Sequence, residues 1–178
     1  PYDVLLDDYE PGLPTAEVRE ICDNLRPKQV ALIKAIGGAK QIKSDFLQKP
    51  LNEKKIWDFS ERVIAEFVYD FKRGRQDKAP HPFETTFSVN DVRITNRYEK
   101  GEPLATLFSA MHECGHALYE LGGNPAYERT PLAGGASLAV HESQSRMWEN
   151  LVGRSLPFWQ HFYPDLKKTF PSQLDGVN

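Results

Sequence analysis

The feature that most constrains this sequence is a helical run from Leu104 to Leu121, which contains the pentad His-Glu-Cys-Gly-His at residues 112–116. Apolar residues recur through the run at helical spacing and predict one core-facing stripe, with Gly115 as the small gap in it. The stripe comprises Leu104, Leu107, Phe108, Met111, Leu118 and Leu121. Residues four apart stand one turn above each other on a helix, so the two histidines of the pentad share a face.

Two stacked imidazoles can reach a single metal ion, at the nitrogen–metal distances of roughly 2.0–2.1 Å found for zinc. Glu113 is rotated about 100° around the helix from each neighbour, so it is poorly placed as a third ligand from the same turn. It can, however, reach a water in an open coordination position, which makes it a candidate general base. Cys114 faces neither histidine and is expected to be a packed or partly exposed thiol. The alternative is that His112 and His116 are ordinary core or surface histidines.

A hydrolytic metal site needs a third protein ligand. Glu120 would lie in line with the two histidines over about 12 Å of helix rise, which cannot close a tetrahedron. Glu142, on a separate helix expected over residues 137–152, can approach from another direction. His141 beside it is the competing ligand. Adjacent helical positions differ by about 100°, so only one of the two should face the metal.

Bulk properties limit the class of protein. A length of 178 residues suits one domain, or a fragment of one, with a sizeable core. A net charge of −3 argues against nucleic acid or an anionic membrane as the main partner. The sequence has no run of eighteen apolar residues and begins with acidic residues, so a cytoplasmic location is expected. Cys22 and Cys114 form no disulfide pattern, which favours a reducing compartment.

Further helices are predicted on both sides of the pentad. Residues 1–14 are expected to be irregular, and a helix capped by Thr15 is expected to be interrupted by Pro27. A second segment should run from Pro27 to Ile36, and a third from Leu51 to about Lys72. An aromatic-rich helix should begin at Ser155. The apolar stripe of the third segment consists of Ile56, Phe59, Val63, Phe67 and Phe71.

Residues 85–98 change to a period of two and predict a β-hairpin with Asn90-Asp91 as its turn. Val89 should then face Val92, and Phe87 should face Ile94, on one apolar side. The other side, with Ser88, Arg93 and Thr95, either edges a cleft or is solvated. His81, held between two prolines, is either directed at a site or an ordinary histidine. The predicted fold is mainly α, with one small β-hairpin beside the metal-binding helices.

Four motifs together resemble the carboxypeptidase Taq family of metallocarboxypeptidases. They are His81-Pro82-Phe83, Asp91-Val92-Arg93-Ile94-Thr95, the segment His112–Glu120, and the segment His141–Asn150. The resemblance implies a helical peptidase with His112, His116 and Glu142 as metal ligands and Glu113 as the base. It also implies release of single amino acids from the carboxy termini of peptides, with Zn²⁺ or sometimes Co²⁺, and commonly a homodimer.

The sequence departs from this family in length. It is shorter than the usual member and ends before the arginine-bearing motif and the motif with glutamine and tryptophan, which are expected to grip the substrate carboxylate and the oxyanion. Candidates within the chain are His81, Arg93 and Tyr119, with Tyr98, Arg97 and Arg146 as further possibilities. Two alternatives follow: a non-catalytic metal-binding fragment that lacks the substrate-anchoring half, or a metalloendopeptidase with an open cleft.

Overall fold

The structure is a computed structural model that describes residues 2–42 and 44–177. The chain forms two compact units, which we describe separately. One consists of Pro1–Ser44 with Ala136–Leu138, and the other of Asp45–Gly135 with Ala139–Asn178. The metal-ligand candidates all belong to the second unit. Whether the chain is one catalytic domain or a fragment of one stays a prediction.

The first unit contains a short helix, α1 (Asp3–Leu6), and a long one, α2 (Thr15–Gly38). The predicted break at Pro27 is wrong, because α2 continues through that residue. A proline removes one backbone hydrogen bond from a helix. Leu25, Arg26, Lys28 and Gln29 around Pro27 are good helix formers, so the helix continues through this residue. Thr15 is not the N-cap; Pro14 occupies that position, and the Thr15 N–H donates to Asp3 Oδ1 at 2.8 Å.

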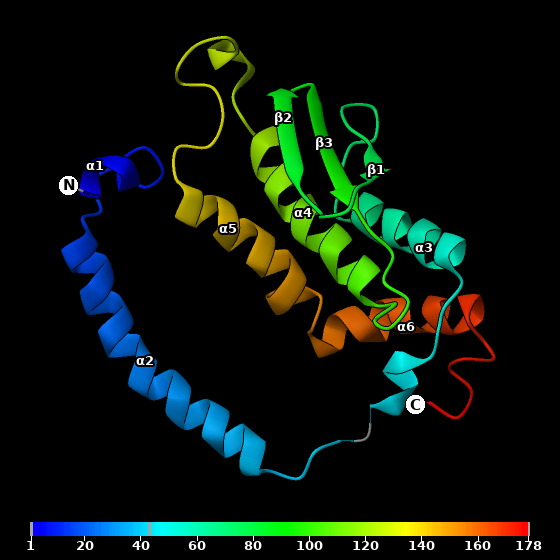
Figure 1. Cartoon of the computed structure of the whole chain (residues 1–178). Coiled ribbons are helices and arrows are strands. Elements are labelled where there is room, and N and C mark those ends of the chain that lie inside the picture. The colour runs from blue at the N-terminus through cyan, green and yellow to red at the C-terminus, as the bar shows by residue number, and fades with distance from the viewer. Residues whose placement is uncertain (1, 43, 178) are drawn as a thin grey trace. The chain divides into compact units, whose positions relative to one another are not determined.

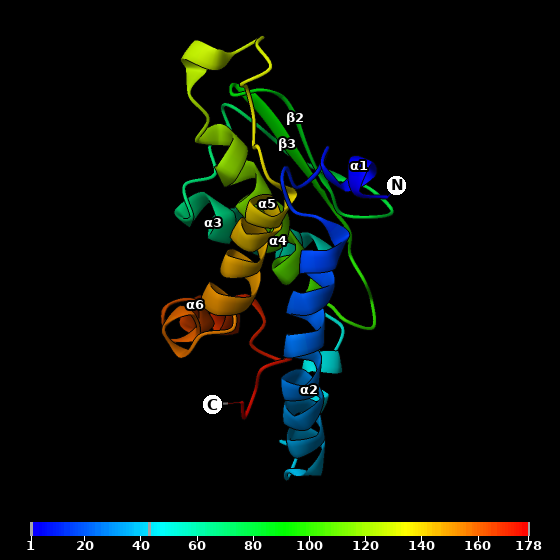
Figure 2. The same ribbon diagram turned by 90° about the vertical axis from the view of Figure 1, so that its left-hand side faces the viewer.

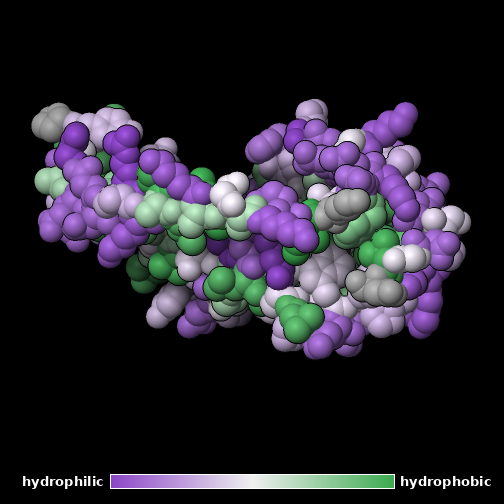
Figure 3. Space-filling model, turned by 90° about the horizontal axis from the view of Figure 1, so that it is seen from below, coloured by the Kyte–Doolittle hydropathy of each residue, from purple (hydrophilic) through white to green (hydrophobic). Residues whose placement is uncertain are grey.

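The apolar side of α2 is exposed. None of its residues, all of which the structure describes, is buried. Ile33 is 67% exposed and Ile36 is 55% exposed, although both are apolar residues of the segment predicted from Pro27 to Ile36. Figure 3 shows green hydrophobic side chains among purple hydrophilic ones on the surface of the molecule. The pattern that predicted a helix here therefore did not predict a buried face.

The second unit is built around α4 (Ala105–Leu121), which bears the pentad and confirms the predicted helix. α3 (Glu53–Glu66) and the β-sheet pack against α4, as does the segment η3 (Met147–Val152) (Figure 1). This arrangement places α4 between the sheet and the later helices. Residues of α4 that are fully or almost fully buried include Leu107, Ala110, Met111, Cys114 and Ala117.

α3 ends earlier than predicted. Ile56, Phe59, Val63 and Phe67 are buried as expected, but the helix stops at Glu66. Val68 adopts φ 72°, and the Tyr69 N–H returns to the Ile64 carbonyl at 3.0 Å, a closure typical of helix C-termini. Phe71 is consequently outside the helix and 40% exposed. The predicted core position of Phe71 is therefore wrong.

The sheet has three strands rather than two. β1 (Gln76–Lys78), which was not predicted, pairs in parallel with β3 (Asp91–Asn96), and β2 (Glu84–Ser88) pairs antiparallel with β3 on its other side. The hairpin is confirmed, but its register is not as predicted: Glu84 pairs with Ile94 and Thr86 with Val92. An irregularity between Thr86 and Ser88 leaves Phe87 66% exposed. A bulge of this kind shifts side chains from one face to the other.

The chain after α4 confirms the two predicted helical regions. α5 (Leu138–Arg146) continues into η3, a π-helical segment that ends at Gly153. α6 (Leu156–Thr169) starts where predicted, and Ser155 is its N-cap, because Ser155 Oγ accepts the Phe158 N–H at 3.2 Å. In Figure 2, α6 is seen end-on while α5 runs across the view, so these two helices cross steeply. Short 3₁₀ turns occupy Asp45–Gln48 (η1) and Pro125–Tyr127 (η2).

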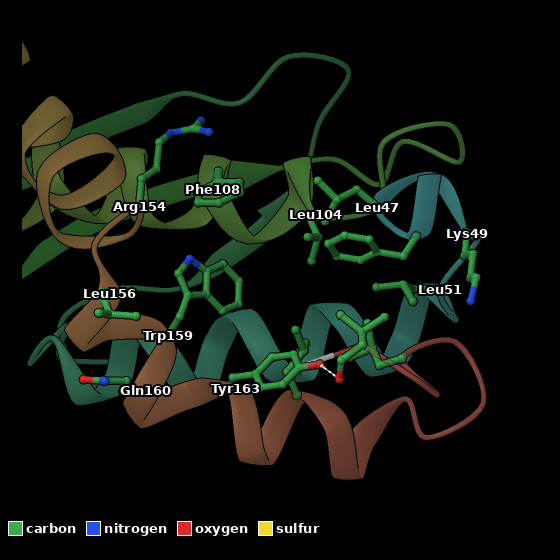
Figure 4. Close-up of a pocket in the computed structure, with 14 residues that line it drawn as sticks. Leu47, Lys49, Leu51, Leu104, Phe108, Arg154, Leu156, Trp159, Gln160 and Tyr163 are labelled. Carbon is green, nitrogen blue, oxygen red and sulfur yellow. Dashed lines mark hydrogen bonds between the residues drawn. The ribbon is translucent and has the colours of Figure 1, made fainter. Parts of the chain in front are cut away.

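An apolar cavity of about 620 Å³ lies among α4, α6 and η1 (Figure 4). Leu104, Phe108 and Trp159 point into it, and the Tyr163 hydroxyl donates to the Val177 carbonyl at 2.7 Å. Its lining is mainly aliphatic and aromatic, with Lys49, Arg154 and Gln160 as polar members. Among the described residues, no helix combines the length and apolarity that crossing a bilayer requires.

Candidate metal centre

Two helices bring the three predicted ligands together. α4 supplies His112 and His116, and α5 supplies Glu142. Glu142 Oε2 lies 3.6 Å from His112 Nε2 and 3.3 Å from His116 Nε2, and the three possible ligand atoms lie within 4.8 Å of one another. Two imidazole nitrogens and one carboxylate oxygen form the donor set of many hydrolytic zinc sites. The residues present therefore fit a divalent metal.

The Glu142 carboxylate is held by its own helix. Arg146 Nε donates to Oε1 at 2.8 Å, and Ser145 Oγ donates to Oε2 at 3.1 Å. Partial burial alone would raise the pKa of Glu142, but the hydrogen bonds from Arg146 and Ser145 and the nearby positive charge together lower it. The carboxylate is thus kept ionised, with Oε2 directed at the two histidines.

His141, the competing ligand, points elsewhere. Its Nδ1 lies 2.6 Å from His116 Nδ1, and its Nε2 lies 2.8 Å from Glu120 Oε1. Both ring nitrogens are therefore already engaged, and the geometry favours Glu142 as the third ligand. Glu120, rejected as a ligand from its spacing, contacts His141 instead.

The sequence analysis did not predict that Glu149 contacts His112, on the ring nitrogen that faces away from Glu142. Glu149 Oε2 lies 2.9 Å from His112 Nδ1. Glu149 follows Glu142 by seven residues, two helical turns, so the spacing alone placed both carboxylates on one face. Arg154 also reaches Glu149, with Nη2 at 3.1 Å from Oε1. Each histidine of the pentad therefore has an outer partner on Nδ1, which leaves Nε2 for the metal.

Glu113 lies on α4 between these groups and is only 7% exposed. Burial raises its pKa to about 7, with further contributions from the carboxylates of Glu84, Glu142 and Glu149. A carboxyl group with a pKa near neutrality can both accept and return a proton at physiological pH. This property suits the general base that the pentad predicted.

The pKa values of His116 and His141 are shifted in opposite directions. Burial, together with His141 and His112, lowers the pKa of His116 to about 4, so its imidazole is neutral and able to bind a metal. The hydrogen bond to Glu120 raises the pKa of His141, and the same bond lowers the pKa of Glu120. The cluster thus contains a neutral histidine that is a candidate ligand, next to a histidine paired with a carboxylate.

The substrate and oxyanion candidates are less well grouped. Tyr119 places its ring edge against His141, with centroids 5.1 Å apart. Arg93 binds its neighbour Asp91 with two hydrogen bonds of 2.7 and 2.8 Å and stacks over Phe87. His81 is exposed, and in residues 2–42 and 44–177 no contact joins its side chain to the metal-site cluster. The structure therefore brings Tyr119 to the cluster, but not His81 or Arg93.

The remaining candidates bind other parts of the second unit. The Tyr98 hydroxyl donates to the Leu51 carbonyl at 2.6 Å, and Arg97 contacts Pro80 and Glu99. Arg146 is the one arginine among the named candidates that touches a predicted ligand, through Glu142. Its side chain is 58% exposed, so part of the guanidinium faces solvent beside the site.

Comparison with known sequences identifies the family. The sequence model of the carboxypeptidase Taq (M32) metallopeptidases matches residues 1–178. The chain belongs to the M32 family. Thermostable carboxypeptidase 1 of Thermus thermophilus is 41% identical to this M32 chain over 175 residues, which are 98% of the chain and 34% of the relative. The protein of the same name from Pyrococcus furiosus is 43% identical over a match of length 177 that covers 96% of the chain and 35% of the relative.

Solved structures agree with this assignment. A crystal structure of an M32 carboxypeptidase from Deinococcus radiodurans R1 matches with a TM-score of 0.96 and 45% identity, covering 99% of this chain and 35% of that one. The family recognised from the four motifs and the mainly helical fold class are both confirmed. The M32 chain spans about a third of the length of the curated relatives it matches.

Proposed function

We propose that this chain carries the metal centre and general base of a metal-dependent carboxypeptidase. The observation that carries the proposal is the convergence of His112 Nε2 and His116 Nε2 on Glu142 Oε2, at 3.6 and 3.3 Å. The two helices leave room in the donor set for a solvent-derived ligand, because His141, the nearest further imidazole, is bound on both nitrogens. Membership of a metallopeptidase family also supports the proposed metal centre.

In the proposed mechanism, Glu113 removes a proton from the attacking water and returns it to the leaving amine. When bound, a divalent metal supplies Lewis acidity, which lowers the pKa of water and polarises the scissile carbonyl. Burial keeps the pKa of Glu113 at about 7, so one group can act first as base and then as acid. Tyr119 is our candidate for a contact near the oxyanion, since it alone of the three predicted candidates borders the cluster.

We propose Zn²⁺ as the metal, with Co²⁺ as an alternative, because two imidazoles and a carboxylate match zinc chemistry. We further propose a peptide with a free carboxy terminus as the substrate, a cytoplasmic location and a homodimer. None of the proposed steps involves nucleic acid or a membrane.

The experiment is digestion of a free-carboxylate peptide and its amidated twin, with and without chelator and added Zn²⁺ or Co²⁺, followed by mass spectrometry. Stepwise loss of residues from the free carboxy terminus, abolished by chelator, is the expected result. Glu113→Gln should reduce turnover by about 10² to 10⁴-fold while leaving metal binding intact. Near-full activity of that variant would remove Glu113 from its assigned role.

Two other outcomes would replace the proposal. Cleavage of both peptides at internal bonds would indicate an endopeptidase, consistent with the pairing of Arg93 with Asp91 rather than with a free site. Metal binding without cleavage of either peptide would indicate a metal-binding fragment. Both are distinguishable from the carboxypeptidase by the products alone.

A further inference from the structure

We propose that Glu120 and Glu149 are positioning residues, which set the metal affinity of the centre by fixing the proton on Nδ1 of His116 and His112, with Glu120 acting through His141. This inference rests on the proposed metal centre. It concerns groups that are not ligands themselves, and it assigns a role to a histidine and two carboxylates outside the ligand set.

The first path runs from His116 through His141 to Glu120, and its contacts determine where each proton lies. If His116 binds a metal through Nε2, its proton must be on Nδ1. That Nδ1–H donates to His141 Nδ1, 2.6 Å away, so His141 Nδ1 must carry a lone pair. The proton of His141 is then on Nε2, which donates to Glu120 Oε1 at 2.8 Å. The carboxylate of Glu120 thereby selects the tautomer of a residue that it does not touch.

The end of this path is held rigidly. The Gly135 N–H donates to Glu120 Oε1 at 3.1 Å. A Cβ at position 135 would lie 2.5 Å from Tyr119 Cε1 and 3.2 Å from His141 Cδ2, so the backbone of this loop packs closely against both rings. The side chains of Glu120 and His141 are only 10% and 16% exposed. A carboxylate fixed in this way holds the His141 ring in one orientation.

The second path is the direct contact between His112 and Glu149. Glu149 Oε2 accepts from His112 Nδ1 at 2.9 Å, and the same carboxylate is bound by Arg154 at 3.1 Å and approached by Arg146 at 3.5 Å. The Glu149 side chain is 15% exposed. The two ligand histidines are thus oriented differently: His112 by a carboxylate, and His116 by an imidazole that a carboxylate holds.

Loss of either negative charge should weaken metal binding, because an uncharged partner favours less strongly the tautomer that leaves Nε2 of His112 or His116 free for the metal. Outer partners of metal-binding histidines typically contribute 10 to 100-fold to affinity. The structure also provides a matched control. His161 Nε2 and Glu66 Oε2 form a His–Glu contact of 2.9 Å between α6 and α3, exposed and outside the metal cluster.

The test measures Zn²⁺ affinity of the full chain by competition with a chromophoric chelator, with the Co²⁺ absorption spectrum as a check on coordination. Glu120→Gln and Glu149→Gln should each bind Zn²⁺ about 10 to 100-fold more weakly, and Glu66→Gln should bind as the wild type does. Thermal unfolding of the metal-free variants confirms that each is folded. The isosteric Gln replacements keep the size of each side chain.

A double-mutant cycle isolates the indirect path. Because Glu120 acts through His141, Glu120→Gln should cost no further affinity in a protein that already carries His141→Ala. Nitrogen–proton correlation NMR of the metal-free wild type should show His116 protonated on Nδ1 and His141 on Nε2. If the role of Glu120 were purely structural, Glu120→Gln would cost the same Zn²⁺ affinity with and without His141. It would also leave the tautomers of His116 and His141 unchanged.

The outcomes separate the two proposals. Unchanged Zn²⁺ affinity in Glu120→Gln and Glu149→Gln, with binding by the wild type, would overturn the positioning roles and leave the metal centre standing. Equal losses from Glu120→Gln with and without His141 would overturn the indirect path. A wild-type chain that binds neither Zn²⁺ nor Co²⁺ would overturn the proposed metal centre, and the positioning roles with it.

Discussion

Gly115 of α4 lies directly against Ser145 of α5. A Cβ built on Gly115 would be 2.6 Å from Ser145 Cα and 2.7 Å from the Gln144 carbonyl oxygen, distances that real side chains do not adopt. The absence of a side chain at this position lets the backbone of α5 approach the middle of the pentad. Glu142, one turn before Ser145, is brought to the two histidines by the same crossing.

Gly115→Ala should therefore separate the two helices and weaken Zn²⁺ binding by at least about tenfold. It should also lower the free energy of unfolding by about 1–3 kcal/mol, as overpacking of a core does. Chelator competition and denaturant unfolding measure the two effects. Gly37→Ala in α2 is the matched control, since a Cβ there meets nothing within 4 Å. Wild-type affinity in Gly115→Ala would show that the close crossing does not position Glu142.

Glu113 should make the metal-free protein less stable as pH rises. Its pKa in the folded state is about 7 against an ordinary 4.5, so the folded protein retains a proton that the unfolded chain releases. The free energy of unfolding should fall between about pH 4.5 and 7, by on the order of 3 kcal/mol, and then stay level. Below pH 4.5 both states are protonated, and the contribution vanishes.

Denaturant unfolding of metal-free wild type and Glu113→Gln across this range checks the prediction. The difference between the two proteins should grow in favour of the variant up to about pH 7. Glu17→Gln, at an exposed position of α2, controls for the loss of one carboxylate. Parallel pH profiles of the wild type and Glu113→Gln would mean that the pKa of Glu113 is not raised.

Metal binding should stabilise the second unit. A ligand that binds only the folded state at 100 times its dissociation constant adds about 2.7 kcal/mol to the free energy of unfolding. Added Zn²⁺ should therefore raise the unfolding midpoint, and chelator should reverse the rise. Glu142→Gln should lose most of this response, because the only carboxylate of the predicted ligand set is removed. An equal response in that variant would place the metal elsewhere.

Pro27→Ala should strengthen α2. The helix is continuous through Pro27, so alanine restores a backbone donor within it and removes a residue about 3 kcal/mol less favourable in helix interiors. Amide hydrogen exchange in residues 19–36 should become slower. Lys28→Ala, at the next exposed position, should change exchange little. Faster or unchanged exchange in Pro27→Ala would indicate a break in the helix at this residue.

Patterns within short stretches of the sequence were sufficient to predict the elements that depend only on neighbouring residues. The period of the apolar residues predicted α4, and the spacing of its two histidines placed them on one face, because helix geometry is the same in any fold. The cap at Ser155 and the hairpin were also predictable from a few neighbouring residues. The end of α3 and the register of β2 on β3 were not, since a closure at Val68 and a bulge at Phe87 depend on what packs around them.

Tertiary structure alone decided which side chains meet at the metal centre. The sequence left Glu142 and His141 as competing ligands, because a difference of about 100° between neighbours does not say which one faces another helix. The crossing at Gly115 turned Glu142 inward and left His141 between His116 and Glu120. Contacts between residues distant in sequence depend on how helices pack, and a pattern within one helix carries no information about its neighbour.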